Sequence, residues 1–418
     1  MFGRPQLYTS YKADASVLPT WTQRVGVAVL MLIAVTLPFN LPVFRAIPIV
    51  RYLGDGDWIR ITTGALIFAV AALGLNLLTG VAGQVSLGHA FFMGVGAYTA
   101  VYLGGEGGSR VWGHGLPMWI WLPGAGVGAA LVGLIVAPAA VRVRGLYLAI
   151  VTVGLVFIGI HLSRVLPEIS GAAEVGRNFP DLSFRWWKEE DPVVAFDDDG
   201  KWFGFVEVSD RQATYLFALA LLVVAVVVSK NLIRTRTGRA LQAIRDRDVA
   251  AEVMGVPEVR YKLIAFSISS FFAGVAGAVF ASFLGRVPPE TWSLLLSVQF
   301  IAIILIGGAG TTAGPLLGAL FVVLLPDHLE RFVAWMGSQA EGSSIWARFW
   351  DMFVSTGVGD FGFVADFQPA PGFPLPGSLL DAVLYGTLII VFLLFEPRGL
   401  FGIWIKIRNY WKRWPFSY

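Results

Sequence analysis

Residues 61–105 read ITTGALIFAVAALGLNLLTGVAGQVSLGHAFFMGVGAYTAVYLGG and contain no Asp, Glu, Lys or Arg. A helix needs about 20 mostly apolar residues to cross the hydrocarbon core of a bilayer. This stretch is therefore long enough for two membrane helices joined by an uncharged turn. Residues 291–326 form a second stretch of the same kind. The two stretches indicate an all-α protein that is embedded in a membrane.

The composition of the whole chain agrees with this fold class. Of the 418 residues, 56% are hydrophobic and 14% are charged, whereas soluble domains have about 25% charged residues. Without cysteine the chain has no disulfide framework, thiolate metal site or cysteine nucleophile. A net charge of +3 is too small to indicate a nucleic-acid-binding protein.

Further uncharged or nearly uncharged runs complete a bundle of about ten spans. Each of the two long stretches counts as two helices. The other runs are residues 25–44, 118–141, 146–163, 213–228, 263–285 and 382–395. No cleavage pattern follows the first run, so it is interpreted as a retained helix and not as a signal peptide. We treat residues 1–418 as a single transmembrane domain.

The charges of the connecting segments predict the orientation, because Lys and Arg accumulate on the cytoplasmic side. Residues 230–262 hold eight basic residues against four acidic ones, and the tail 401–418 is also basic. Residues 168–211 and 327–381 are acidic and are expected to be extracytoplasmic. Both termini are then cytoplasmic. Arg45, Arg51 and Arg60 are the exception, since they fall on the outer side.

Glycine-rich sequence interrupts both long stretches, at residues 79–89 and 306–315. Non-helical backbone at membrane depth is tolerated only where protein buries it or a watered cavity meets it, and paired interruptions indicate a transport site. The candidate path residues are Asn76, Gln84, Ser86, His89, Gln299, Thr311 and Thr312. The alternative for the glycines is close packing of membrane helices.

The chain offers no energy source of its own. The pair Gly200-Lys201 is followed by Trp202, so the nucleotide-binding motif fails. No charged residue lies centrally in a span, and the four histidines have no metal spacing. We therefore expect no catalytic residue, metal or cofactor. If the protein moves solute uphill, another component supplies the energy.

Residues 235–257 form the most informative cytoplasmic segment. Asp248 is a suitable N-cap, and Gly255 a suitable residue after a helix end. They bracket a helix at residues 249–254, which is too short to be stable alone. Ala250 and Ala251 would allow close approach of a second surface, with Arg239, Arg245 and Asp248 fixing its orientation. The alternative is a basic loop that only sets topology or attracts anionic lipid.

Five further motifs occur along the chain: GLNLLTG (74–80), GQVSLGHA (83–90), RGLYLAIVT (144–152), TGRALQAIR (237–245) and EPRGL (396–400). Together they resemble one family, the branched-chain amino acid permeases of ABC importers of the LivM type. Within the cytoplasmic segment, the resemblance extends to the A-A-x-x-x-G loop that docks on the ATPase. It implies two cytoplasmic ATPase subunits, a second similar permease, an extracytoplasmic binding protein and a bacterial inner-membrane location.

The sequence thus predicts an importer permease for branched-chain or related amino acids, and not an enzyme. The tail at 401–418 fits a helix at the cytoplasmic headgroup boundary, since Trp404, Ile407, Trp411 and Trp414 share one face. The runner-up is a self-sufficient channel or facilitator for a small polar solute such as urea or an amide. A membrane-embedded enzyme would need a cluster of acid, base or metal ligands, which the sequence lacks.

Overall fold

The computed structural model describes most of the membrane region. The described residues are 21–39, 56–108, 111–143, 145–171, 176–185, 194–196, 200–202, 206–340, 354–355, 364–365, 375–396 and 398–413. Arg144, Pro397, Trp414 and large parts of both acidic segments lie outside these ranges.

Ten apolar helices coincide with the ten expected spans. They are α2 (Trp21–Thr36), α5 (Gly56–Leu75), α6 (His89–Gly104), α7 (Met118–Arg142), α8 (Leu146–Val165), α10 (Asp210–Arg234), α13 (Glu258–Leu284), α14 (Leu294–Gly307), α15 (Gly314–Ala340) and α17 (Gly377–Phe395). Among the described residues, six regions are long and apolar enough to cross a membrane. The span count of ten therefore stays a prediction.

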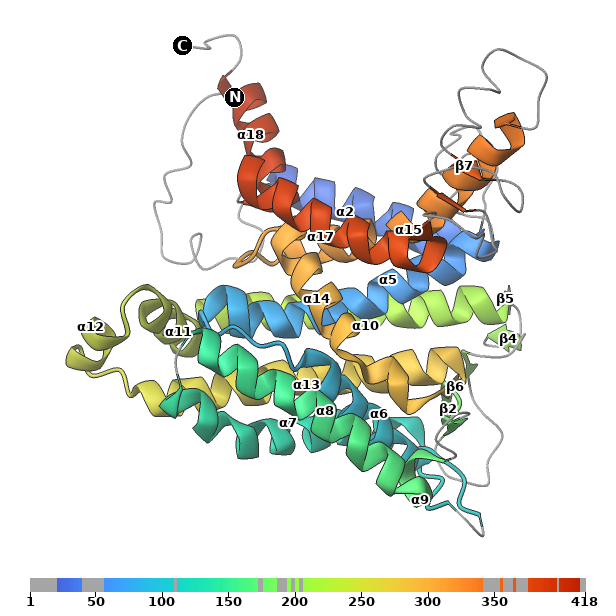
Figure 1. Cartoon of the computed structure of the whole chain (residues 1–418), viewed down its shortest axis with the longest axis horizontal. Coiled ribbons are helices and arrows are strands. Elements are labelled where there is room, and N and C mark those ends of the chain that lie inside the picture. The colour runs from blue at the N-terminus through green and yellow to red at the C-terminus, as the bar shows by residue number, and fades with distance from the viewer. Residues whose placement is uncertain are drawn as a thin grey trace.

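The centre of the bundle is formed by α5 and α13 (Figure 1). Helix α13 packs against α5, α6 and α7, and α5 also packs against α10 and α15. A helix that is apolar on every side belongs in a protein interior, and residues 65–73 of α5 are all buried. Helix α13 buries many Ala and Gly residues, which let neighbouring backbones approach closely.

The two ends of the bundle differ in character. The short helices α11 (Arg236–Asp246) and α12 (Asp248–Val253) lie at one end, on the left of Figure 1. At the other end lie β1 (Arg177–Asn178), β2 (Ser183–Phe184), β3 (Val194–Ala195), β4 (Gly200–Trp202), β5 (Val206–Val208) and β6 (Arg286–Val287). The pairs are β1–β6, β2–β3 and β4–β5, all antiparallel.

The remaining elements are short or follow the last span. Two of them, α9 (Pro167–Ser170) and the 3-10 helix η3 (Pro289–Trp292), lie among the connections of the strand end. A three-stranded parallel sheet joins β7 (Val354–Ser355), β8 (Val364–Ala365) and β9 (Leu375–Pro376). The 3-10 helix η1 (Leu37–Phe39) follows α2, and α18 (Gly399–Arg413) follows α17. The expected tail helix therefore exists, and its Trp404, Ile407 and Trp411 are exposed.

Three local expectations need correction. Residues 76–81 continue α5 as a π-helix, η2 (Asn76–Val81), so the first interruption is shorter than its glycines suggested. Helix α15 extends to Ala340, well beyond residue 326, where the uncharged stretch ends. The helix expected at residues 249–254 begins at Asp248, with Arg247 as its N-cap residue. Asp248 accepts a hydrogen bond from the adjacent Val249 N–H at 2.8 Å.

Candidate functional site

Two non-helical segments remain in the membrane region. We call residues 82–88, between η2 and α6, the first break. Residues 308–313, between α14 and α15, are the second break. Both lie where the glycine-rich motifs occur, in the two stretches of sequence that carry no charge.

Asn76 joins the two halves of the molecule. Its Nδ2 donates to the Thr311 carbonyl oxygen at 2.8 Å, and its Oδ1 accepts from the Gly310 N–H at 2.7 Å. The side chain is fully buried. A buried amide that fills its donor and its acceptor in this way specifies one arrangement of the two segments. Asn76 and Thr311, both predicted path residues, are therefore in contact across the molecule.

The end of η2 crosses the second break at Gly80. A Cβ at this position would overlap the backbone nitrogen of Gly310, so the crossing requires glycine. The Gly80 carbonyl oxygen accepts a hydrogen bond from Arg245 Nη1 at 2.6 Å. Arg245 belongs to α11 at the cytoplasmic segment. A predicted coupling residue thus contacts the interrupted membrane segment directly.

The start of α6 is fixed by neighbouring helices. His89 Nε2 donates to the Ala71 carbonyl oxygen at 2.9 Å, and its ring packs against Phe300. Ser297 Oγ accepts from the Ala90 N–H at 3.1 Å. Ser86 Oγ accepts more weakly from the Gly88 N–H, at 3.3 Å. His89 and Ser86 are buried and both hold backbone in place. Ser297, which the sequence analysis missed, is a single serine in an apolar helix.

The remaining predicted path residues differ in their surroundings. Thr311 Oγ1 donates to the Gly308 carbonyl oxygen at 2.9 Å and accepts from the Gly314 N–H at 3.0 Å, so it caps α15. Thr312 and Gln299 are partly buried. A path-lining role for any of the seven residues stays a prediction.

A cavity of about 250 Å³ lies where the first break meets the cytoplasmic segment. We call it the junction cavity. Its walls come from the first break, the α7–α8 connection, the α11–α12 connection and α13. Gln84 lines it and is 5% exposed. Within the described residues, neither polar atom of its side-chain amide has a hydrogen-bond partner. A buried amide of this kind needs a partner from outside the described protein.

The cytoplasmic segment presents a different face from the expected one. Ala250 is exposed, but Ala251 is buried within the chain. Ala250 is therefore the alanine that a partner could approach. Val253 and Met254 are 81% and 84% exposed, although they lie outside the apolar spans. Arg239 bonds the carbonyl of Arg234 at 2.9 Å, and Gly255 has a φ of +84°, as a residue after a helix end requires.

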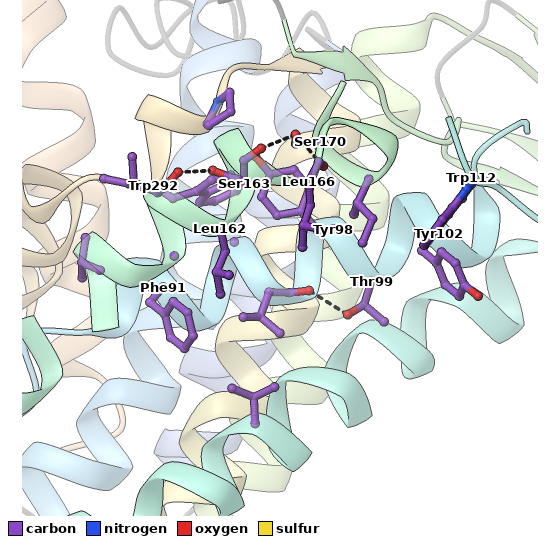
Figure 2. Close-up of a pocket in the computed structure, with 18 residues that line it drawn as sticks. Phe91, Tyr98, Thr99, Tyr102, Trp112, Leu162, Ser163, Leu166, Ser170 and Trp292 are labelled. Atoms are coloured by element: carbon purple, nitrogen blue, oxygen red, sulfur yellow. Dashed lines mark hydrogen bonds between the residues drawn. The ribbon is translucent and has the colours of Figure 1, made fainter. Parts of the chain in front are cut away.

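A larger cavity, of about 560 Å³, lies between α6 and α8 towards the strand end. Figure 2 shows its lining, which includes Phe91, Tyr98, Leu162 and Trp292. The hydroxyl groups of Thr99 and Ser163 bond carbonyl oxygens of their own helices. We call it the outer cavity. Its lining is almost entirely apolar.

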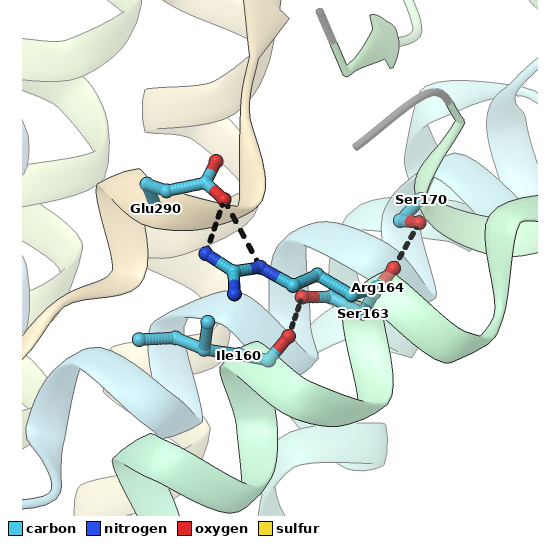
Figure 3. Close-up of polar contacts among 5 residues, drawn as sticks. All are labelled: Ile160, Ser163, Arg164, Ser170 and Glu290. Atoms are coloured by element: carbon cyan, nitrogen blue, oxygen red, sulfur yellow. Dashed lines mark hydrogen bonds and ion pairs between the residues drawn. The ribbon is translucent and has the colours of Figure 1, made fainter. Parts of the chain in front are cut away.

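Helix α8 connects the first break with η3. Near one end, Thr152 Oγ1 accepts from the Leu87 N–H at 2.9 Å. At the other end, Arg164 donates from Nη2 and Nε to Glu290 Oε1 at 2.9 and 3.2 Å (Figure 3). A hydrogen bond from its own backbone N–H, followed by that from Arg164, lowers the pKa of Glu290. Within the described residues, no group of three His, Asp or Glu side chains could hold a metal ion.

These features define a multi-pass helical membrane protein. A model of the family described as branched-chain amino acid transport system / permease component matches residues 58–358. The chain therefore belongs to this family. Two parts of the chain lie outside the matched region, namely the helix at residues 21–36 and the residues after 358.

Individual relatives agree with the family assignment. The high-affinity branched-chain amino acid transport system permease protein LivM of Escherichia coli (strain K12) is 34% identical over 281 residues. The match covers 66% of this chain and 64% of that protein, which is less than two thirds of its length. LivM of Salmonella typhimurium gives the same values. The autoinducer 2 import system permease protein LsrC of Enterobacter sp. (strain 638) is 36% identical over 119 residues, 27% of this chain and 35% of that protein. No solved structure matches the chain.

Proposed function

We propose that the chain is the permease subunit of an ABC importer for branched-chain or related amino acids. Two cytoplasmic ATPase subunits would supply the energy, and a second similar permease and an extracytoplasmic binding protein would complete the complex. The observation that carries this proposal is the hydrogen bond from Arg245 to the Gly80 carbonyl oxygen. It joins the expected docking segment to an interrupted membrane helix, as a permease driven from outside requires.

The proposed mechanism follows the contacts outward from α12. Closure of the ATPases would displace α12, and α11 would move with it. Arg245 would then pull on the end of η2 and on the first break, while Asn76 keeps the start of η2 attached to the second break. A rigid-body shift of this kind can open a path alternately to each side. The helix ends at the breaks would bind the charged groups of a zwitterion through their backbone dipoles. No charged side chain within the membrane is then needed.

In this proposal ten spans place both termini in the cytoplasm. The grouping of α11 and α12 at one end of the bundle, with the strands at the other, supports that orientation. The strand end would face the binding protein. The substrate class rests on the family description and on relatives matched over part of their length.

The test uses the exposed apolar face of α12. Val253→Asp combined with Met254→Asp should reduce substrate-stimulated ATP hydrolysis and uptake at least about tenfold in the reconstituted four-subunit complex. Val259→Asp is the matched control, because Val259 is 52% exposed but lies on α13 beyond the coupling helix. Unchanged coupling in the double variant would contradict the docking assignment. Transport by the purified single chain in liposomes would instead favour a self-sufficient channel.

A further inference from the structure

We infer that the junction cavity is a cytoplasm-facing binding site for a small aliphatic α-amino acid. This inference rests on the proposed function. It adds a site where solute that has already been transported can bind and slow further uptake. It is independent of the outer cavity, which lies between α6 and α8 towards the strand end.

The first argument is the unpartnered amide of Gln84. Both its Nε2 and its Oε1 are buried without a hydrogen bond in the described part of the chain. A protein rarely leaves two such atoms unsatisfied, because each costs its full desolvation penalty. An amide offers one acceptor and two donor hydrogens at one point. Gln84 lines the cavity, and a ligand there with an ammonium group and a carboxylate would satisfy both atoms once the amide turns towards it.

The second argument is the charge of the cavity wall. Arg245, Arg247 and Lys262 contribute positive charge, and Asp246 and Asp248 contribute negative charge. Lys262 is paired with Glu258 at 2.5 Å, and Arg245 is near Asp246 at 3.4 Å. Arg247 makes no ion pair within the described residues. A wall of both signs suits a zwitterion better than a simple anion or cation.

The third argument concerns size and the apolar part of the wall. Val143, Leu148 and Ile244 line the same cavity and provide an aliphatic surface. The volume of about 250 Å³ is below the range of about 300–1,000 Å³ typical of sites for drug-sized ligands. It is therefore suited to a solute with a short aliphatic side chain.

The position of the cavity gives its occupancy a consequence. Ala82, Gly83 and Gln84 belong to the first break, whereas Asp246, Arg247 and Asp248 connect α11 with α12. A bound amino acid would bridge these two parts and hold them in one arrangement. A ligand that prefers one of two arrangements shifts their populations. Accumulated product would then slow further uptake.

The experiment measures binding of tritiated L-leucine to the complex of both permeases and both ATPases in nanodiscs, without the binding protein. Gln84→Leu keeps the volume and removes both polar atoms, so affinity should fall about tenfold or more. Arg247→Gln, an exposed position, should weaken binding about two- to fivefold. The matched control is Thr99→Val in the outer cavity, where the only hydroxyl bond found among the described residues goes to the Val95 carbonyl of the same helix.

The outcomes separate the site from the proposed function. Loss of leucine binding in Gln84→Leu and Arg247→Gln, but not in Thr99→Val, supports the inference. Loss in Thr99→Val alone overturns it and places the site in the outer cavity. ATP-driven, binding-protein-dependent uptake without any leucine binding by the isolated complex also overturns it, while the proposed function stands. If Gln84→Leu does not assemble, Arg247→Gln decides, and unchanged affinity in that variant contradicts the site.

A second readout tests the consequence for transport. Leucine enclosed in vesicles on the side of the ATPases should lower the initial rate of uptake by the wild-type complex. The concentration of enclosed leucine that gives half of this inhibition should rise about two- to fivefold in Arg247→Gln and about tenfold or more in Gln84→Leu. Equal inhibition of all three would show that the feedback arises elsewhere in the complex.

Discussion

The two breaks contain similar residues but are held in place by different contacts. At the first break, side chains make the contacts: Thr152 accepts from the Leu87 N–H, and Arg245 bonds the carbonyl of Gly80, just before the break. At the second break, backbone also packs on backbone, in addition to the hydrogen bonds of Asn76. Here Gly399, at the start of α18, lies against the backbone of Ile306 and Gly308.

This difference assigns the two breaks different roles. A hydrogen bond from a long, partly exposed arginine can break and form again without disturbing its neighbours. Backbone segments in direct contact cannot separate without loss of close packing, because interiors are packed like crystals. We propose that the first break moves during transport and that the second break is its fixed support. The four predictions below test this assignment, beginning with the largest effect.

The largest effect is expected from Gly399→Ala at the second break. Its φ is +64°, and an added Cβ would lie 2.5 Å from the Ile306 carbonyl oxygen and 2.6 Å from the Gly308 nitrogen. Overpacking and the left-handed conformation together should cost about 3 kcal/mol of stability. Thermal unfolding of the purified chain in detergent measures this loss.

Gly255→Ala provides the matched control. Gly255 also has a positive φ, of +84°, but an added Cβ would meet no atom within 4 Å. Gly255→Ala should lower the stability only by the cost of placing alanine in the left-handed conformation, about 1 kcal/mol. Equal losses in the two variants would mean that backbone packing does not hold the second break.

The next largest effect is expected from Asn76→Leu, which removes the connection between the two breaks. The Gly310 N–H and the Thr311 carbonyl would both lose their partner. The expected loss is about 2 kcal/mol, with faster amide hydrogen exchange at residues 308–313. Thr312→Val is the control, because no hydrogen bond of Thr312 is found in the described residues. Unchanged exchange in Asn76→Leu would show that the second break is fixed without the first.

Much of this architecture could be predicted from the sequence. Charge-free stretches located the helices, because burying a charge in lipid is costly. Glycine clusters located both breaks, and Asp248 and Gly255 located α12 to within one residue. These features are local, since each depends on residues only a few positions apart.

The contacts between distant segments could not be predicted in this way. Asn76 and Thr311 are separated by 235 positions, and no local pattern indicates that they meet. The inward direction of Ala251 depends on how α12 packs, which six residues do not determine. His89 had the features of a path residue, but tertiary packing gives it a partner on α5. The polar residues can be identified from the sequence, but only the tertiary contacts determine which of them have hydrogen-bond partners.

The third prediction concerns the first break alone. Arg245→Lys keeps the charge but replaces the planar guanidinium, which contacts both Gly80 and Asp246, with a single ammonium group. Because the side chain is 45% exposed, the expected effect is about 1 kcal/mol. Uptake should fall about fivefold with little change in thermal stability.

Arg239→Lys is the matched control for this variant. Arg239 is on the same helix, but in the described part of the chain its guanidinium bonds only the nearby Arg234 carbonyl. Uptake by this variant should stay within about twofold of the wild type. If both variants lose uptake equally, the positive charge of α11 matters and the contact with the first break does not.

The smallest effect is expected at the pair Arg164–Glu290, which joins α8 to η3 and so links the two breaks from the strand end. The pKa of Glu290 lies below its ordinary value, so ionised Glu290 favours the folded state. This contribution is complete above the unfolded pKa of about 4.3 and is lost as the pH falls through the lower folded value. Both side chains are about half exposed, so salt should weaken it further. Amide exchange at residues 290–292, corrected for the intrinsic effect of pH, should therefore be faster below that folded pKa than at neutral pH. Glu290→Gln should remove the difference. An equal pH effect in Glu290→Gln would mean that α8 and η3 are joined by packing alone, and that the two breaks communicate only through Asn76.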